Sequence, residues 1–249
     1  MKVKQMIGVL LLVATLWNCQ PAAEEVIDKA VLAHGGEIFE HTEVSFKFRD
    51  AYYNLVRNEG AFIYTRIQTD TTGEVITDKV SNKGFVRYFG EMQVQLPDSM
   101  MNKYKNSVNS VAYFFLIPGV LKDPAAKKEY LGKEKIKNTE YYKVKVFFTE
   151  EGGGDDHEDT FVYWVNKGTS FIDYFAYEYK TNGGGIRFRE AVNRQKQAGL
   201  LFCDYVNYAP NDKGATLENM AQLFVDGKLK EVSKIINENV VVKDLKPKQ

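Results

Sequence analysis

Apolar and polar residues alternate along most of this chain with the two-residue period of a β-strand. Residues 44–49, Val-Ser-Phe-Lys-Phe-Arg, alternate strictly, as expected for a strand with one buried face and one exposed face. Glycine- and asparagine-rich turns separate successive segments of this kind, which is typical of hairpins. The pattern therefore predicts one antiparallel sheet of roughly eight to eleven strands. The remaining predicted strands are 61–68, 75–80, 84–89, 140–149, 160–166, 171–180, 186–193 and 200–208.

Three segments repeat apolar residues at helical spacing instead. Residues 24–34 predict a short helix that ends at Gly35-Gly36, and residues 217–225 predict another. Between Pro97 and Pro118, a helical stripe predicts a helix that either packs on the sheet or covers a cavity as a lid. The end of the chain, 228–242, fits a helix or a closing strand. The stripe of the middle helix consists of Met101, Tyr104, Val108, Val111 and Phe115.

The later strands carry large apolar residues on both faces. On 171–180, for example, Phe175 and Tyr177 share one face, while Tyr174 and Ala176 share the other. A sheet of this kind must be covered on both sides, by helices on one and by its own curvature on the other. We therefore expect a mainly β (α+β) fold, in which a strongly curved antiparallel sheet, or half-barrel, is covered by two or three helices. No linker or repeat divides the chain, so residues 26–249 are predicted to form a single domain.

The N-terminus carries an export signal. Lys2 and Lys4 precede eleven apolar residues, 6–16, which are too few to cross a bilayer, since spanning takes roughly 20. The following Leu16-Trp17-Asn18-Cys19 resembles a bacterial lipobox. We expect residues 1–18 to be a lipoprotein signal peptide, Cys19 to be the lipid anchor to the membrane, and residues 19–25 to be a polar tether. The alternative is an ordinary secreted protein with a chance cysteine.

Charge and cysteine content narrow the possible functions. Lys plus Arg equals Asp plus Glu at 33 each, and no basic run stands out, so we expect no nucleic-acid partner. Cys203 is the only other thiol; it lies in an apolar strand and is expected to be a buried hydrophobe rather than a nucleophile. Conventional catalytic, metal-binding and phosphate-binding motifs are missing from the sequence. We assign no catalytic residue and expect neither a metal nor a cofactor.

Polar residues on four successive strands could form one band across the sheet. One hypothesis is a polar site at the base of an apolar cavity, where an arginine holds a carboxylate or phosphate head group. The other is a structural network of arginines and aspartates. Strand parity places Arg187 and Arg189 on one face and Glu190 on the opposite one. The candidate ligand contacts are His157, Asp159, Asp173, Arg187, Arg189 and Asp204.

Four stretches of the later strands resemble the sequences of a known family. His-Glu-Asp-Thr-Phe-Val-Tyr-Trp at 157–164, Asp-Tyr at 173–174, Gly-Gly-Ile-Arg-Phe-Arg-Glu at 184–190 and Phe-Cys-Asp-Tyr at 202–205 resemble a family of uncharacterised exported Bacteroidota lipoproteins. Ala33-His34-Gly35-Gly36 fits the same family, which is similar to the LolA/LolB-like lipoprotein carriers. The resemblance implies a curved antiparallel sheet wrapped around helices, with an apolar cavity that takes acyl chains.

Three hypotheses for the function follow. The first, which the resemblance implies, is a periplasm-facing lipoprotein that binds a lipid or other apolar small molecule in a half-barrel cavity. The second is an envelope enzyme, hydrolase- or aldolase-like, that uses the polar band; a Schiff-base aldolase would require a desolvated lysine. The third is a structural envelope lipoprotein without a ligand. In each case we expect a lipid-anchored protein of the cell envelope, at the outer membrane and facing the periplasm.

Overall fold

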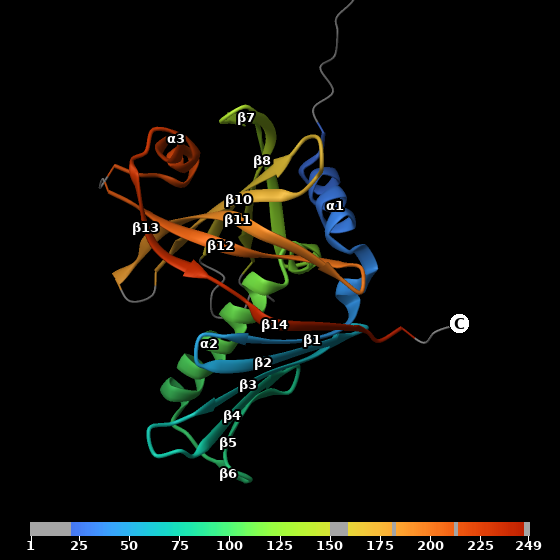
Figure 1. Cartoon of the computed structure of the whole chain (residues 1–249), viewed down its shortest axis with the longest axis vertical. Coiled ribbons are helices and arrows are strands. Elements are labelled where there is room, and N and C mark those ends of the chain that lie inside the picture. The colour runs from blue at the N-terminus through green and yellow to red at the C-terminus, as the bar shows by residue number, and fades with distance from the viewer. Residues whose placement is uncertain (1–20, 150–158, 181–182, 212–213, 247–249) are drawn as a thin grey trace, which may run out of the picture.

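The computed structural model describes residues 21–149, 159–180, 183–211 and 214–246. Within these ranges the chain forms two antiparallel sheets of seven strands each and three α-helices (Figure 1). The first sheet has the strand order β14-β1-β2-β3-β4-β5-β6, and the second has the order β13-β12-β11-β10-β9-β8-β7. Strands β1–β6 and strands β7–β13 each form a meander, and the chain returns from the second sheet to the first between β13 and β14, where β14 is added beside β1.

The first sheet consists of β1 (His41–Phe48), β2 (Ala51–Asn58), β3 (Ala61–Thr69), β4 (Val75–Ser81), β5 (Gly84–Phe89), β6 (Met92–Val94) and β14 (Glu238–Asp244). The second consists of β7 (Ala126–Ile136), β8 (Thr139–Phe148), β9 (Thr160–Asn166), β10 (Ile172–Tyr179), β11 (Gly185–Gln197), β12 (Leu200–Pro210) and β13 (Leu229–Ile235). The helices are α1 (Ala23–His34), α2 (Asp98–Phe115) and α3 (Met220–Val225). Short 3₁₀ helices are η1 (Gly36–Glu40), η2 (Gly119–Lys122) and η4 (Leu217–Asn219).

Strand alternation decides which face of the first sheet is buried. Val44 and Phe46 point into the core, whereas Ser45 and Lys47, which alternate with them, are half-buried on the other face. Helix α2 packs on the buried face, against β3, β4 and β5. Figure 1 shows α2 running along this sheet and ending close to the second one.

The second sheet is buried on both faces, as its sequence predicts. On β10, Phe175 and Tyr177 belong to the main core, which the two sheets share with α1 and α2. Tyr174 and Ala176 belong to a second core on the opposite face, which η4 and α3 cover. Phe224 of α3 lies 5.0 Å from Phe188 and 5.5 Å from Tyr174, centroid to centroid.

Helix α1 packs its apolar face on the second sheet, against β7, β8, β9 and β12. It ends at Gly35, whose φ of 147° is a conformation that residues with a side chain rarely adopt. A Cβ at Gly35 would also lie only 3.1 Å from the Leu200 side chain, so both the backbone conformation and the close packing favour glycine here. The helix begins at Ala23, so the end of the predicted 19–25 tether is helical.

The predicted mainly β fold with helices is confirmed, but the single sheet of eight to eleven strands is wrong. Two sheets form because β6 and β7, which α2 and η2 separate in the chain, do not pair, and β14 then pairs with β1 rather than with β13. The prediction also omitted β2, β6 and β7. Strand β7 is buried only at its two ends, Ala126 and Ile136, and its lysine- and glutamate-rich sequence shows no alternation of apolar and polar residues. Of the helices that the structure describes, none combines the length and apolar character needed to cross a membrane.

Candidate ligand cavity

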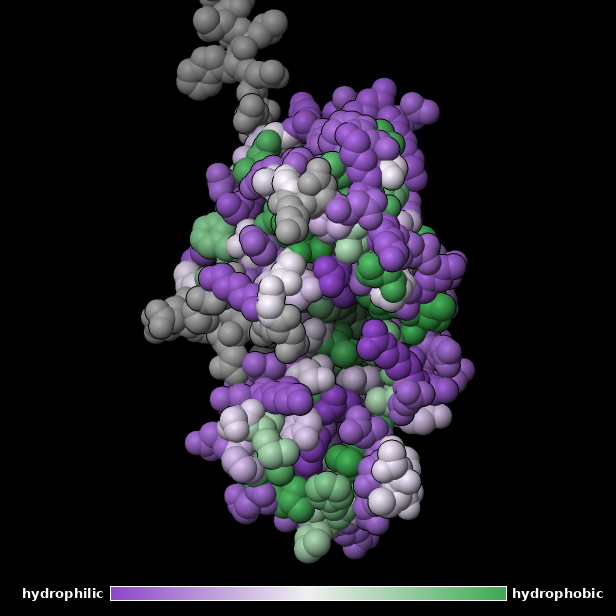
Figure 2. All heavy atoms as spheres, turned by 90° about the vertical axis from the view of Figure 1, so that its left-hand side faces the viewer, coloured by the Kyte–Doolittle hydropathy of each residue, from purple (hydrophilic) through white to green (hydrophobic). Residues whose placement is uncertain are grey.

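A cavity of about 920 Å³ lies between α2 and the second sheet, close to the turn between β1 and β2. Its walls come from α2, β10, β11, β12 and β13, and from Asn237 in the link between β13 and β14. Figure 2 shows the corresponding side of the molecule, with a hollow at mid-height in which apolar side chains are visible at depth. The volume lies in the upper part of the range of roughly 300–1,000 Å³ that is usual for small-molecule sites.

Aromatic side chains form the inner wall. Phe114 of α2 lies 5.0 Å from the ring of Tyr177 and 5.9 Å from that of Phe175. Phe115 stacks on Phe46 of the first sheet at 4.3 Å and also contacts Phe202 of the second sheet at 5.8 Å. The C-terminal end of α2 thus holds the two sheets at a fixed separation, with apolar surface on the cavity side.

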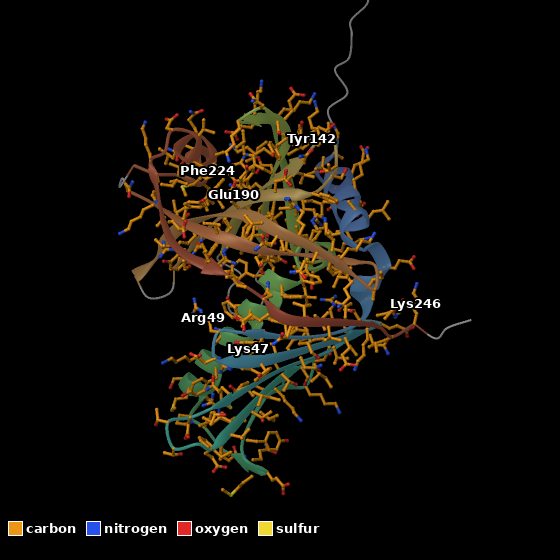
Figure 3. The ribbon with its side chains drawn as sticks, viewed as in Figure 1. Lys47, Arg49, Tyr142, Glu190, Phe224 and Lys246 are labelled. Carbon is orange, nitrogen blue, oxygen red and sulfur yellow. The ribbon has the colours of Figure 1, made fainter. Side chains whose placement is uncertain are left out.

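Basic residues outnumber acidic ones along the cavity. Arg49, Lys103, Arg187 and Arg189 line it, whereas Asp159 is the only acid among its described lining residues. Arg49 follows β1 with a positive φ of 55°, and Figure 3 shows it at the level between the two sheets. The chain as a whole carries no net charge, so the cavity is positive relative to the rest of the protein.

Arg189 is the most deeply buried of these cations, at 6% exposed. Its guanidinium stacks on Phe114, with Cζ 3.8 Å from the ring centroid, and its Nη2 donates to Tyr177 Oη at 3.0 Å. Its Nε is buried without a hydrogen-bond partner among the described residues, and no described carboxylate forms an ion pair with it. Burial lowers the pKa of Arg189 from its usual value, because the charged form has lost its water.

Neutral phenols surround this guanidinium. Tyr113 and Tyr163 share a hydrogen bond of 2.9 Å between their hydroxyls, and Tyr205 lines the cavity. Burial raises the pKa of Tyr113, Tyr163 and Tyr205 above the usual value. These groups therefore stay protonated at neutral pH and supply polarity without a counter-charge for Arg189.

The structure brings three of the predicted polar residues to the cavity. Asp159, Arg187 and Arg189 line it, and the last two lie on the same face of β11 as strand parity predicted. Glu190 lies on the opposite face, where it accepts from Tyr208 and pairs with Lys137 at 3.3 Å. Figure 3 shows Glu190 on the same side of the sheet as Phe224. His157 lies outside the described residues.

Asp173 does not line the cavity, in contrast to the predicted band. The β9–β10 register shifts between Ile172 and Tyr174, and this bulge breaks the alternation on which the prediction depended. Asp173 accepts from Tyr141 Oη at 3.0 Å and from Arg194 Nη2 at 2.5 Å. It belongs to a structural polar network, although with Arg194 rather than Arg187 or Arg189.

Asp204 is also structural. It is buried, and its Oδ1 accepts from the backbone N–H of Asn237 at 2.9 Å, while Oδ2 accepts from Asn193 at 3.2 Å. Asn237 additionally donates to the carbonyl of Cys203 at 3.1 Å. Asp204 therefore fixes the point where the chain passes from one sheet to the other. Burial raises the pKa of the Cys203 thiol to about 11, as expected for a buried hydrophobe rather than a nucleophile.

The contributions of α2 and of the first sheet to the cavity were not predicted from the sequence. Helix α2 packs on the first sheet and also lines the cavity. The two predicted roles, packing on the sheet and covering a cavity, therefore each describe part of its position. The polar face of α2 was visible in the sequence, but nothing there showed that it borders a cavity. The polar lining residues of α2 are Ser99, Lys103, Asn106, Ser107 and Ser110.

A buried charge cluster beneath α2 was also missed. Asp78 is fully buried between Arg66 and Arg87, at 2.6 Å from each. Arg66 donates to Ser107 Oγ at 2.8 Å, and the Arg87 guanidinium lies 3.4 Å from the ring centroid of Tyr104. The cluster fastens α2 to the first sheet. In the sequence, these three residues look like ordinary charged residues on three successive strands, β3, β4 and β5.

These features define a two-sheet protein with a cavity that opens to the surface, and its fold is similar to that of solved structures. A LolA superfamily protein from Nitrosomonas europaea has the same fold, with a TM-score of 0.51 at 13% identity, covering 91% of this chain and 96% of that one. The fold is therefore LolA-like. The predicted similarity of fold to LolA-like proteins is confirmed, and the assignment to Bacteroidota stays a prediction.

The chain belongs to the family of unknown function DUF6503, whose model matches residues 4–237. Other similar structures resemble it less. A domain from Vibrio parahaemolyticus, assigned as a candidate outer membrane lipoprotein-sorting protein, has a TM-score of 0.44 at 9% identity, covering 82% of this chain and 99% of its own. The Mycobacterium tuberculosis lipoprotein LppX has a TM-score of 0.27 at 10% identity, covering 64% and 87% respectively. No curated protein matches the sequence.

Proposed function

We propose that this protein is a periplasm-facing lipoprotein of the cell envelope that holds an apolar or lipid-like ligand between its two sheets. The cavity carries this proposal: it has a volume of about 920 Å³ and an inner wall of aromatic side chains. Side chains at this depth are normally packed against one another, so a space of this size is suited to a guest molecule. The LolA-like fold and the predicted export signal with Cys19 support the same function.

The enzyme alternative has less support. It required the candidate polar residues to form one band, but Asp173 and Asp204 are held elsewhere by Arg194 and Asn237. An aldolase-like reaction would need a desolvated lysine, and Lys103, the one lysine among the described lining residues, is exposed.

Binding of a neutral fluorescent probe, N-phenyl-1-naphthylamine, to residues 20–249 tests the proposal, because this segment contains the whole described fold. Ser110 is exposed and lines the cavity, so Ser110→Trp should fill part of the space and weaken binding by about tenfold or more. Asn109→Trp, at the adjacent non-lining position of α2, provides the matched control and should bind the probe like the wild type.

Mass spectrometry of solvent extracts from protein purified from its native host should identify a co-purifying apolar compound. Wild-type protein that neither binds the probe nor carries such a compound would instead support a structural lipoprotein without a ligand. Equal loss of binding in the Ser110 and Asn109 variants would show that the probe does not occupy this cavity.

A further inference from the structure

The cavity contains a positive charge that the described part of the protein does not neutralise. The Arg189 guanidinium is buried, lines the cavity, and has no carboxylate partner among the described residues. Burying an unpaired charge is unfavourable, and cation–π contacts recover only part of the lost hydration. An anionic group bound beside Arg189 would supply the missing partner.

Arg189 also has hydrogen-bonding capacity to spare. Its Nη2 donates to Tyr177 Oη, whereas its Nε has no partner among the described residues. Because Tyr177 Oη accepts this bond, its own hydrogen remains available for a second acceptor. Tyr177 also lines the cavity, so guanidinium and phenol can both reach one negatively charged oxygen group there.

The other cations of the cavity favour the same kind of ligand. Arg187 and Arg49 lie against aromatic rings, with Cζ 5.1 Å from the Tyr179 centroid and 5.0 Å from that of Phe48 respectively. Neither forms an ion pair with a carboxylate of the described chain. Together with Lys103, they give the described lining three cations besides Arg189, against one acid, Asp159.

We infer that the ligand is an anionic amphiphile whose carboxylate or phosphate group lies inside the cavity, bound by Arg189 and Tyr177, with its alkyl chain along the aromatic wall. This inference rests on the proposed function and narrows it to a class of ligand. A purely apolar guest would leave the guanidinium unpaired beside it. An inorganic anion would leave the aromatic surface around Phe114 and Phe115 empty.

Displacement of N-phenyl-1-naphthylamine by three ligands of equal chain length, and by inorganic phosphate, tests this inference on residues 20–249. Dodecanoate and dodecyl phosphate carry the charge, dodecanol lacks it, and inorganic phosphate lacks the chain. Wild-type protein should bind at least one of the two anionic amphiphiles about tenfold or more tightly than dodecanol, which corresponds to ~1.4 kcal/mol. Inorganic phosphate should not displace the probe.

Variants separate recognition from a structural role. Arg189→Met keeps the length of the side chain and should abolish the preference for the anion while leaving dodecanol binding within about threefold. Arg189→Lys should retain part of the preference because it retains the charge, and Tyr177→Phe should reduce it. Arg194→Met removes an arginine that pairs with Asp173 outside the cavity lining, so the preference should be unchanged.

Equal affinities of wild-type protein for dodecanoate, dodecyl phosphate and dodecanol would overturn the inference and leave the apolar carrier intact. Uniform weakening of all ligands by Arg189→Met would do the same, since it would assign Arg189 a purely structural role. The ratio of affinities in the wild type decides the question even if a variant fails to fold. Failure of every amphiphile and of the probe to bind would overturn the proposed function itself.

Discussion

Asp78 should be among the most sensitive positions for stability, although it lies outside the cavity lining. It is fully buried and accepts four hydrogen bonds: Arg66 donates through Nε and Nη2, at 3.1 and 2.6 Å, and Arg87 through the same atoms, at 2.6 and 2.9 Å. Asp78→Asn preserves the shape but removes the charge and turns an NH₂ group towards one of the guanidinium groups. Two buried arginines would then lack their only counter-charge in this cluster.

The expected loss follows from the cost of breaking a buried ion pair. Removing one partner of such a pair costs about 3–5 kcal/mol, chiefly because the remaining charge stays buried. For a chain of this size, each kcal/mol shifts Tm by about 2–4 °C, so Tm should fall by roughly 6–20 °C. The free energy of unfolding should fall by a similar 3–5 kcal/mol in urea titrations, without a large change in the m-value.

Glu238→Gln provides the matched control. Glu238 pairs with Lys47 at 3.6 Å, and the Glu238 side chain is exposed while that of Lys47 is partly exposed, so the same change from carboxylate to amide should alter stability little. Asp78→Asn and Glu238→Gln should therefore differ clearly in both Tm and urea midpoint. If Asp78→Asn destabilised the protein no more than the control, the cluster would not hold α2 to the first sheet as the geometry indicates.

Three further predictions concern the anchor, the second core and pH. Cys19→Ala should abolish incorporation of labelled fatty acid and release the protein from membranes; a variant that still partitions into detergent like the parent would refute lipidation. Met220, the first residue of α3, is fully buried in the second core, so Met220→Ala should lower the free energy of unfolding by about 2–5 kcal/mol, measured in urea, whereas a change below about 1 kcal/mol would mean that α3 packs loosely. His34 is buried and its pKa is lowered to about 4, chiefly by desolvation, so only the unfolded state gains its proton as the pH falls below about 6.5. The free energy of unfolding should be unaffected by His34 above that pH and should decline by about 3 kcal/mol towards pH 4. His34→Gln should flatten this dependence between pH 7 and 5 relative to His41→Gln, and identical pH profiles of these two variants would contradict the assignment.

Much of the local structure could be predicted from the sequence, because alternation and turn chemistry act over a few residues. Helix α1 was predicted as 24–34 and observed as Ala23–His34, and β9 was predicted with its observed bounds, Thr160–Asn166. The parity of Arg187, Arg189 and Glu190 was also correct, since β11 keeps its register across these residues. The two-sided apolar character of β10 correctly indicated that the second sheet is covered on both faces.

Only the tertiary structure decided how these elements combine. Which sheet β14 joins depends on its pairing with β1, almost 200 residues earlier in the chain, and no local pattern encodes that choice. The bulge at Asp173 was equally invisible, because one extra residue in a ladder leaves the apolar pattern nearly unchanged. The cavity brings together residues of α2, the β1–β2 turn and four strands of the second sheet, so its size and its unpaired Arg189 result from long-range packing. The sequence by itself determined the strands and the side chains that each face presents; the packing of two sheets around α2 decided which of those side chains face a ligand.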